Sequence, residues 1–87
     1  MKEAQIYIID YKNLNIARME IYDKELASGK LGLSKTIKGD FTKLDNVLKR
    51  LSKIRDIHIT TFLGDDSGYT FVKGKIGSKL QDKYHTF

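Results

Sequence analysis

Two aromatic residues and then two lysines occupy every second position at the end of the stretch "DDSGYTFVKGK", which covers residues 65–75. Alternate residues of a strand point to the same face, so Tyr69, Phe71, Lys73 and Lys75 would share one face. Aromatic rings stack on bases of any sequence, and lysine ammonium groups neutralise phosphates without reading bases. This face therefore predicts a surface that binds nucleic acid with little sequence specificity.

The same surface would extend to neighbouring segments. If residues 65–68 form the loop of a hairpin, Phe62 faces Phe71 on the adjacent strand. Tyr7 lies on one side of the first expected strand, and lysines follow the exposed side of the expected helix. The predicted nucleic-acid-binding residues are Tyr7, Lys49, Lys53, Phe62, Tyr69, Phe71, Lys73 and Lys75.

A second interpretation of these residues needs no ligand. Cross-strand aromatic pairs stabilise a hairpin by roughly 0.2–1 kcal/mol each, and the first hairpin could fold over them. The lysines of residues 30–43, of the helix and of residues 73–83 would then form only a solvated surface. Convergence of these three lysine clusters on one side of the fold would indicate a polyanion site.

Two short segments resemble the consensus strands of the RNA-recognition motif. "IYIIDY" (6–11) is similar to the shorter consensus strand, with Tyr7 at the stacking position. "GYTFVK" (68–73) is similar to the longer one, with Tyr69 and Phe71 at the stacking positions. The resemblance implies that these segments are adjacent strands of a four-stranded sheet. The long connection before the expected helix and the short stretch after Ile76 depart from that family.

Asp65 and Asp66 stand together in a glycine-flanked turn. A divalent cation bound there would need further oxygen ligands, for which Asp10, Asp23 and Glu25 are candidates. Asp and Gly are also ordinary turn-forming residues. We therefore predict a turn, and assign neither a metal site nor a cofactor.

His58 could act as the general base of a small ribonuclease, with Lys73 or Lys75 stabilising the phosphate. This arrangement depends on the same hairpin register as the stacking face. A histidine on a strand face is more often structural, so we expect a binding protein, not an enzyme, and assign no catalytic residue.

Strand and turn patterns predict the elements that position these residues. β-branched and aromatic residues predict a strand over 4–12, and strict alternation predicts its hairpin partner over 16–23. Residues 57–63 and 69–76 predict a second hairpin. Residues 31–39 predict a third strand, which Gly32 would weaken. Residues 77–87 predict either a short terminal helix or a loose tail.

Residues 40–56 predict the main helix. An apolar stripe recurs at helical spacing along it, at Leu44, Val47, Leu48, Leu51 and Ile54. Asp40 and Thr42 are rival N-cap residues, and Asp45 and Lys49 are spaced for an i, i+4 ion pair. The expected fold class is α+β: a small, mostly antiparallel sheet of four to five strands with this one helix on one face, in the order β-β-(β)-α-β-β. Residues 1–87 would form a single domain.

Composition narrows the classes of function. The formal net charge is +5, which favours polyanions or acidic protein surfaces as partners. The chain has no cysteine, which excludes disulfides and thiolate metal sites and favours a cytoplasmic protein. No apolar run is long enough for a membrane span or a secretory signal.

We therefore expect a small basic intracellular protein that binds single-stranded or duplex nucleic acid. Two alternatives stay open. One is a regulator or inhibitor, encoded by a virus or mobile element, that binds a host enzyme. Its exposed strand 31–39 would be available for pairing with a partner or for homodimerisation. The other is a small ribonuclease toxin that uses His58.

Overall fold

The computed structural model describes residues 1–65, 68–70 and 74–84, apart from the side chains of residues 65, 69 and 70. Strands precede and follow a first helix, and a second helix comes last. Their bounds are β1 (Lys2–Tyr11), β2 (Ala17–Glu25), β3 (Leu31–Gly39), α1 (Phe41–Leu51), β4 (Arg55–Asp65), β5 (Gly68–Thr70) and α2 (Lys75–Lys83). Neither described helix has the length and apolar character that crossing a membrane requires.

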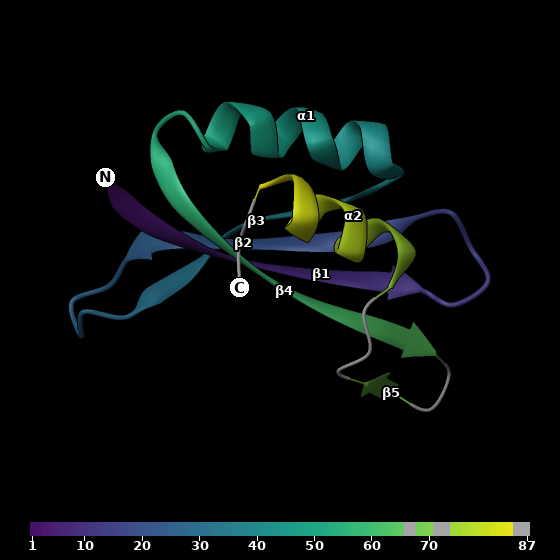
Figure 1. The fold of residues 1–87 in the computed structure, drawn as a ribbon. Helices are drawn as coiled ribbons and strands as arrows, with labels where there is room; N and C mark the ends of the chain where they lie inside the picture. Colours follow the sequence, from purple (N-terminus) through teal and green to yellow (C-terminus); the bar gives the residue numbers. More distant parts are fainter. Residues whose placement is uncertain (66–67, 71–73, 85–87) are drawn as a thin grey trace.

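The strands form one mixed sheet in the order β3-β2-β1-β4-β5. β1 pairs antiparallel with β2, β2 with β3, and β4 with β5, whereas β1 and β4 are parallel. The parallel pair arises because α1 carries the chain from β3, at one edge, across the sheet to the other side of β1. Both helices lie on the same face of the sheet (Figure 1).

The core lies between this face and the two helices. β1, β2 and β4 contribute alternate residues, as the sequence pattern predicts, and the helices contribute the residues of their inner sides. The buried cluster comprises Ala4, Ile6, Ile8, Ala17, Met19, Ile21, Leu44, Leu48, Ile57, Ile59, Ile76 and Leu80.

The fold class α+β is confirmed, but two details of the prediction are wrong. α1 ends at Leu51 with Ser52 as its C-cap, so Ile54 lies beyond the helix and is 65% exposed. The prediction also had one main helix, whereas α2 packs beside α1 on the same face and begins at Lys75, within the expected second hairpin. Residues 31–39 do form a strand, and Asp40 is the N-cap of α1, because its Oδ1 accepts the Lys43 N–H at 3.0 Å.

The second hairpin has the predicted register over its described residues. Pairing of Phe62 with Phe71 implies pairing of Leu63 with Thr70, which is the observed partner. The hairpin does not bring Lys75 opposite His58, as the predicted register and the ribonuclease alternative require. Lys75 belongs to α2, and His58 lies beside Gln5 of β1. Residues 71–73 lie outside the described residues.

Candidate nucleic-acid interface

The face of the sheet opposite the helices, called the open face below, gathers partly exposed aromatic residues. Tyr7 of β1 is flanked by Glu20 of β2 and Thr60 of β4. One step along, Ile9 is flanked by Arg18 and Phe62. Strand order and alternation together therefore place side chains from three strands on one surface.

Tyr7, Tyr22 and Phe62 form an aromatic cluster at the centre of this face. The Tyr7 ring meets the Tyr22 ring edge to face, with centroids 5.3 Å apart and planes at 81°. The centroids of Tyr7 and Phe62 are 5.9 Å apart, and their planes are tilted by 45°. All three side chains are partly exposed and line an open pocket of about 270 Å³ together with Ile9, Arg18 and Glu20. The cluster offers aromatic surface to a flat ligand.

Polar groups on the pocket wall are ordered by Glu20. Its Oε1 accepts a hydrogen bond from the Tyr22 hydroxyl at 3.0 Å, and its Oε2 lies 3.3 Å from Nη2 of Arg18. The hydrogen bond to Glu20, followed by burial, raises the pKa of Tyr22 above its ordinary value. Tyr22 therefore remains a neutral donor at physiological pH, and the Glu20 charge is balanced by Arg18.

A second aromatic and basic pair lies on the same face. Lys38 of β3 is the register partner of Arg18. Its ammonium group stands 5.0 Å from the centroid of the Tyr11 ring. A cation over an aromatic face is attracted to the ring's negative π surface. The open face thus carries two cationic side chains near its rings.

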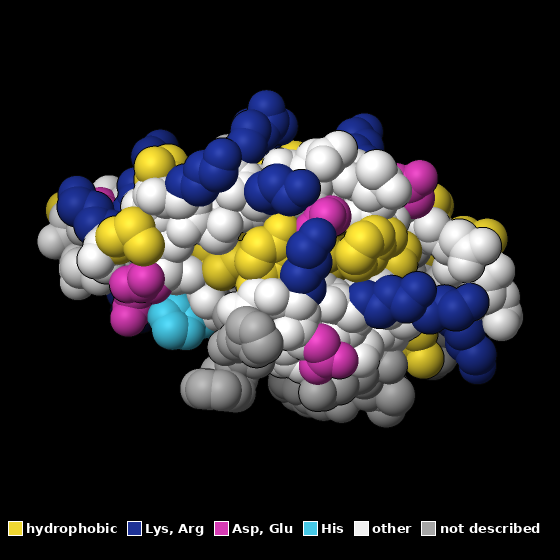
Figure 2. Space-filling view, turned by 45° about the horizontal axis from the view of Figure 1, so that its top comes forward, with side chains coloured by type: hydrophobic (Ala, Val, Ile, Leu, Met, Phe, Trp, Pro, Cys, Tyr) yellow, Lys and Arg dark blue, Asp and Glu magenta, His cyan; other side chains and the backbone are white. Residues whose placement is uncertain are grey.

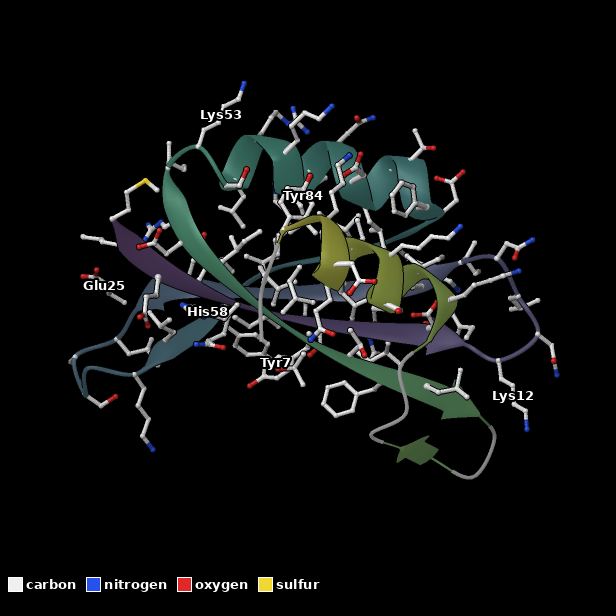
Figure 3. All side chains as sticks on the ribbon, viewed as in Figure 1. Tyr7, Lys12, Glu25, Lys53, His58 and Tyr84 are labelled. Atoms are coloured by element: carbon white, nitrogen blue, oxygen red, sulfur yellow. The ribbon has the colours of Figure 1, made fainter. Side chains whose placement is uncertain are left out.

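The predicted binding residues are only partly brought together. Tyr7 and Phe62 meet on the open face. Lys49 and Lys53 are exposed on and after α1, on the opposite side of the sheet, as Figure 3 shows for Tyr7 and Lys53. Lys75 is the first residue of α2. The Tyr69 side chain, Phe71 and Lys73 lie outside the described residues.

The three lysine clusters are distributed over more than one side of the described chain. Figure 2 shows Lys and Arg side chains spread across the side that carries the helices, with an apolar strip among them. Lys79 and Lys83 each place an ammonium group 6.0 Å from the Phe41 ring on that side. Lys38 is on the open face instead. The convergence that would have marked one polyanion site is therefore not observed among the described lysines.

His58 has a different neighbour from the one that a ribonuclease site would require. Its Nε2 lies 3.7 Å from Oε1 of Glu3, and both side chains are substantially exposed. Lys75 is in α2, and Lys73 is outside the described residues. The geometry at His58 is that of an exposed surface pair.

Asp10 has a structural role that the sequence pattern did not suggest. Only 2% of it is exposed, and its two carboxylate oxygens accept the backbone N–H groups of Ile76 at 2.8 Å and of Gly77 at 2.9 Å. These donors belong to the first turn of α2, where helix N–H groups have no partner within the helix. Asp10 therefore anchors α2 to β1, and both oxygens considered as metal ligands are engaged.

No group of three or more His, Asp or Glu side chains that could hold a metal occurs among the described residues. Asp66, one of the two turn carboxylates considered for such a site, is not among them. Asp23 and Glu25 lie at the far end of β2 from the turn that follows β4.

Asp45, Lys83 and Tyr84 join the two helices, and we call them the α1–α2 clamp. Asp45 accepts a hydrogen bond from Nζ of Lys83 at 2.7 Å and one from the Tyr84 hydroxyl at 2.7 Å. Burial alone would raise the pKa of Asp45, but these two hydrogen bonds and the Lys83 charge lower it overall. Burial and the bond to Asp45 raise the pKa of Tyr84. The ion pair within α1 expected between Asp45 and Lys49 is replaced by this contact between helices.

Stability is expected to fall at both extremes of pH through this clamp. The pKa of Asp45 lies below its ordinary value of 3.8 in the folded chain, so its contribution is complete above about pH 4 and is lost on further acidification. The pKa of Tyr84 lies above its ordinary value of 10.0, so its contribution is complete below about pH 10 and is lost as pH rises.

Asp45→Asn is expected to lower the free energy of unfolding by about 1–2 kcal/mol at neutral pH, because charge-assisted hydrogen bonds are lost. Urea denaturation should show this difference shrinking as the pH falls below about 4, because Asp45 is then protonated first in the unfolded state. Asp82→Asn, an exposed change on α2, is the control. A difference that stays constant with pH would contradict the role of the clamp.

No protein-family model, curated protein or solved structure matches the chain. The RNA-recognition motif places its two consensus strands side by side, whereas here β4 lies between β1 and β5. The adjacency of the two strands that the resemblance of residues 6–11 and 68–73 implied is therefore not observed.

Proposed function

We propose that the protein binds single-stranded nucleic acid with little sequence specificity through the open face of its sheet. The observation that carries this proposal is the aromatic cluster of Tyr7, Tyr22 and Phe62. Its rings are partly exposed around an open pocket, on the face that neither described helix covers. Cross-strand packing explains the contacts between the rings, whereas stacking on a ligand would use the parts of the rings that stay exposed.

The chemistry of the face suits a flexible polyanion. Bases that are unstacked from one another can stack on the aromatic rings, each for about 1–3 kcal/mol. Arg18 and Lys38 lie beside the rings, where they can meet backbone phosphates. A duplex keeps its bases stacked internally, so the proposal favours single strands.

The first test is a fluorescence-polarisation titration with random-sequence single-stranded and duplex DNA and RNA at two salt concentrations. Two or three phosphate contacts should weaken single-strand binding by about tenfold between roughly 50 and 200 mM salt, through counterion release. Duplexes should bind more weakly. Absence of single-strand binding at the lower salt, or binding that does not respond to salt, would refute the proposal.

A pair of charge-neutralising variants distinguishes the two sides of the molecule. Lys38→Gln, on the open face, should weaken single-strand binding and reduce the salt dependence by about one phosphate contact. Lys53→Gln removes the same charge on the helix side and is the matched control. A larger effect of Lys53→Gln would instead place the binding surface on the helix side, where the predicted residues Lys49 and Lys53 lie.

A further inference from the structure

β3 is an edge strand, because it has β2 as a neighbour on one side and begins the strand order on the other. Most of its side chains are exposed, from Leu33 to Thr36 in succession and again at Lys38. The outward backbone N–H and C=O groups of an edge strand can pair with an added strand. This edge is at the opposite end of the strand order from β4 and β5.

A regular stretch of five residues is available for such pairing. The ladder between β2 and β3 runs without interruption from Ala17 opposite Gly39 to Ile21 opposite Lys35. It becomes irregular beyond that point, where Ser34 donates its hydroxyl hydrogen to the Ile21 carbonyl oxygen at 3.3 Å. Bulges shorten the length over which an edge can pair, so any added strand would be centred on residues 35–39.

A groove lies beside this edge, between β2 and β3 on one side and α1 on the other. Its volume is about 280 Å³. Its apolar lining includes Val47, Leu51 and the exposed Ile54. Its charged lining residues are Asp23, Lys35 and Arg50. An aliphatic side chain of a bound segment would find apolar surface here directly next to the backbone edge.

Charge decides which kind of strand can occupy the edge. Lys35 and Lys38 stand on the regular stretch, and Arg50 reaches the groove from α1. A second copy would gather its own two lysines on the same short ladder, where like charges opposite or diagonal to one another are destabilising. This argues against the homodimer expected as one use of residues 31–39. A segment with acidic side chains would instead meet three cations and one acid, Asp23.

We propose that β3 and its neighbouring groove bind an extended acidic segment of another protein as an added strand. Backbone hydrogen bonds along residues 35–39 would hold the segment. Its acidic side chains would meet Lys35 and Arg50 on the helix side and Lys38 on the open face. One aliphatic side chain would enter the groove. This site shares only Lys38 with the surface proposed for nucleic acid, and it does not depend on nucleic-acid binding.

The probe is a short capped peptide of glutamates with one valine at its centre, compared with the same peptide carrying lysine in place of glutamate, so that acidic side chains point to both faces. Amide hydrogen exchange of the full chain should slow by about tenfold within residues 35–39 when the glutamate peptide is added. The lysine peptide should bind at least about tenfold more weakly. The proposal would be overturned if amide exchange of residues 35–39 stayed unchanged at millimolar peptide, or if both peptides bound with equal affinity. It would also be overturned if a single-stranded oligonucleotide, and not the peptide, slowed this exchange.

Substitutions at exposed positions test the charges separately. Lys35→Glu should lower the affinity for the glutamate peptide and raise the affinity for the lysine peptide, each by about tenfold. Lys12→Glu makes the same change at the turn between β1 and β2 and should alter neither affinity. Equal effects of the two variants would mean that the peptide responds only to the net charge of the protein, and this would contradict a binding site at β3. Ile54→Asp, which adds an acid beside the groove, should weaken the glutamate peptide in the same way.

Discussion

Asp10→Ala is expected to lower the free energy of unfolding by about 4 kcal/mol. The change removes the acceptor of two N–H groups in the first turn of α2 and leaves them buried without a partner, at roughly 1–3 kcal/mol each. α2 also contributes Ile76 and Leu80 to the core, so loss of its anchor exposes apolar surface. The aromatic cluster lies on the other face and should be affected only through stability.

Urea denaturation followed by circular dichroism measures this loss. Asp82→Ala is the matched control, because it removes an exposed carboxylate from α2 itself and should change stability by less than about 0.5 kcal/mol. Asp10→Asn should give an intermediate loss, because the amide offers one acceptor oxygen where the carboxylate offers two. A loss below about 1 kcal/mol for Asp10→Ala would mean that α2 does not depend on this contact.

The surroundings of Asp10 also explain the glycines at the start of α2. Gly74 has a φ of −79°, which any residue can adopt, so its backbone conformation does not require glycine. A Cβ added to Gly74 would overlap the Asp10 carboxylate, and one added to Gly77 would press on Thr61. Close approach of α2 to β1 and β4 is therefore what both glycines permit.

Local patterns in the sequence were sufficient for much of the fold. Alternation predicted both faces of β2, with Met19 buried and Glu20 on the other side, and helical spacing predicted the buried residues Leu44 and Leu48. The register of the second hairpin followed from the length of its turn. Each of these features depends on residues that are close together in the chain.

Features that join distant residues were not predictable in this way. Nothing in the alternation of β1 or β4 indicates that the two strands are parallel neighbours, so the contact of Tyr7 with Phe62 required the strand order. The first turn of α2 is capped by Asp10, which is far away in the chain. The sequence around Lys75, where α2 begins, also fits the pattern of a strand. Alternation along β2 places Tyr22 on the same face as Glu20, but its place in the aromatic cluster depends on the same strand order.

The double variant Tyr7→Leu and Phe62→Leu is expected to weaken single-strand binding by about 100-fold or more. Each ring that stacks on a base contributes about 1–3 kcal/mol, and leucine cannot provide the flat π surface. Leucine keeps most of the apolar contact between neighbouring strands, so the free energy of unfolding should change far less than with alanine. Polarisation titrations at low salt, with thermal unfolding of the same samples, measure both quantities.

Phe41→Leu is the matched control, because it removes an aromatic ring on the helix side, where Lys79 and Lys83 lie near it. If stacking on the open face drives binding, this variant should retain the wild-type affinity while the double variant loses it. Equal losses would indicate a general effect on the fold. Unchanged affinity of the double variant would contradict binding through the open face, and cross-strand packing would then be the explanation for the aromatic cluster. The β3 edge would remain as a binding surface, because its proposed partner does not use these rings.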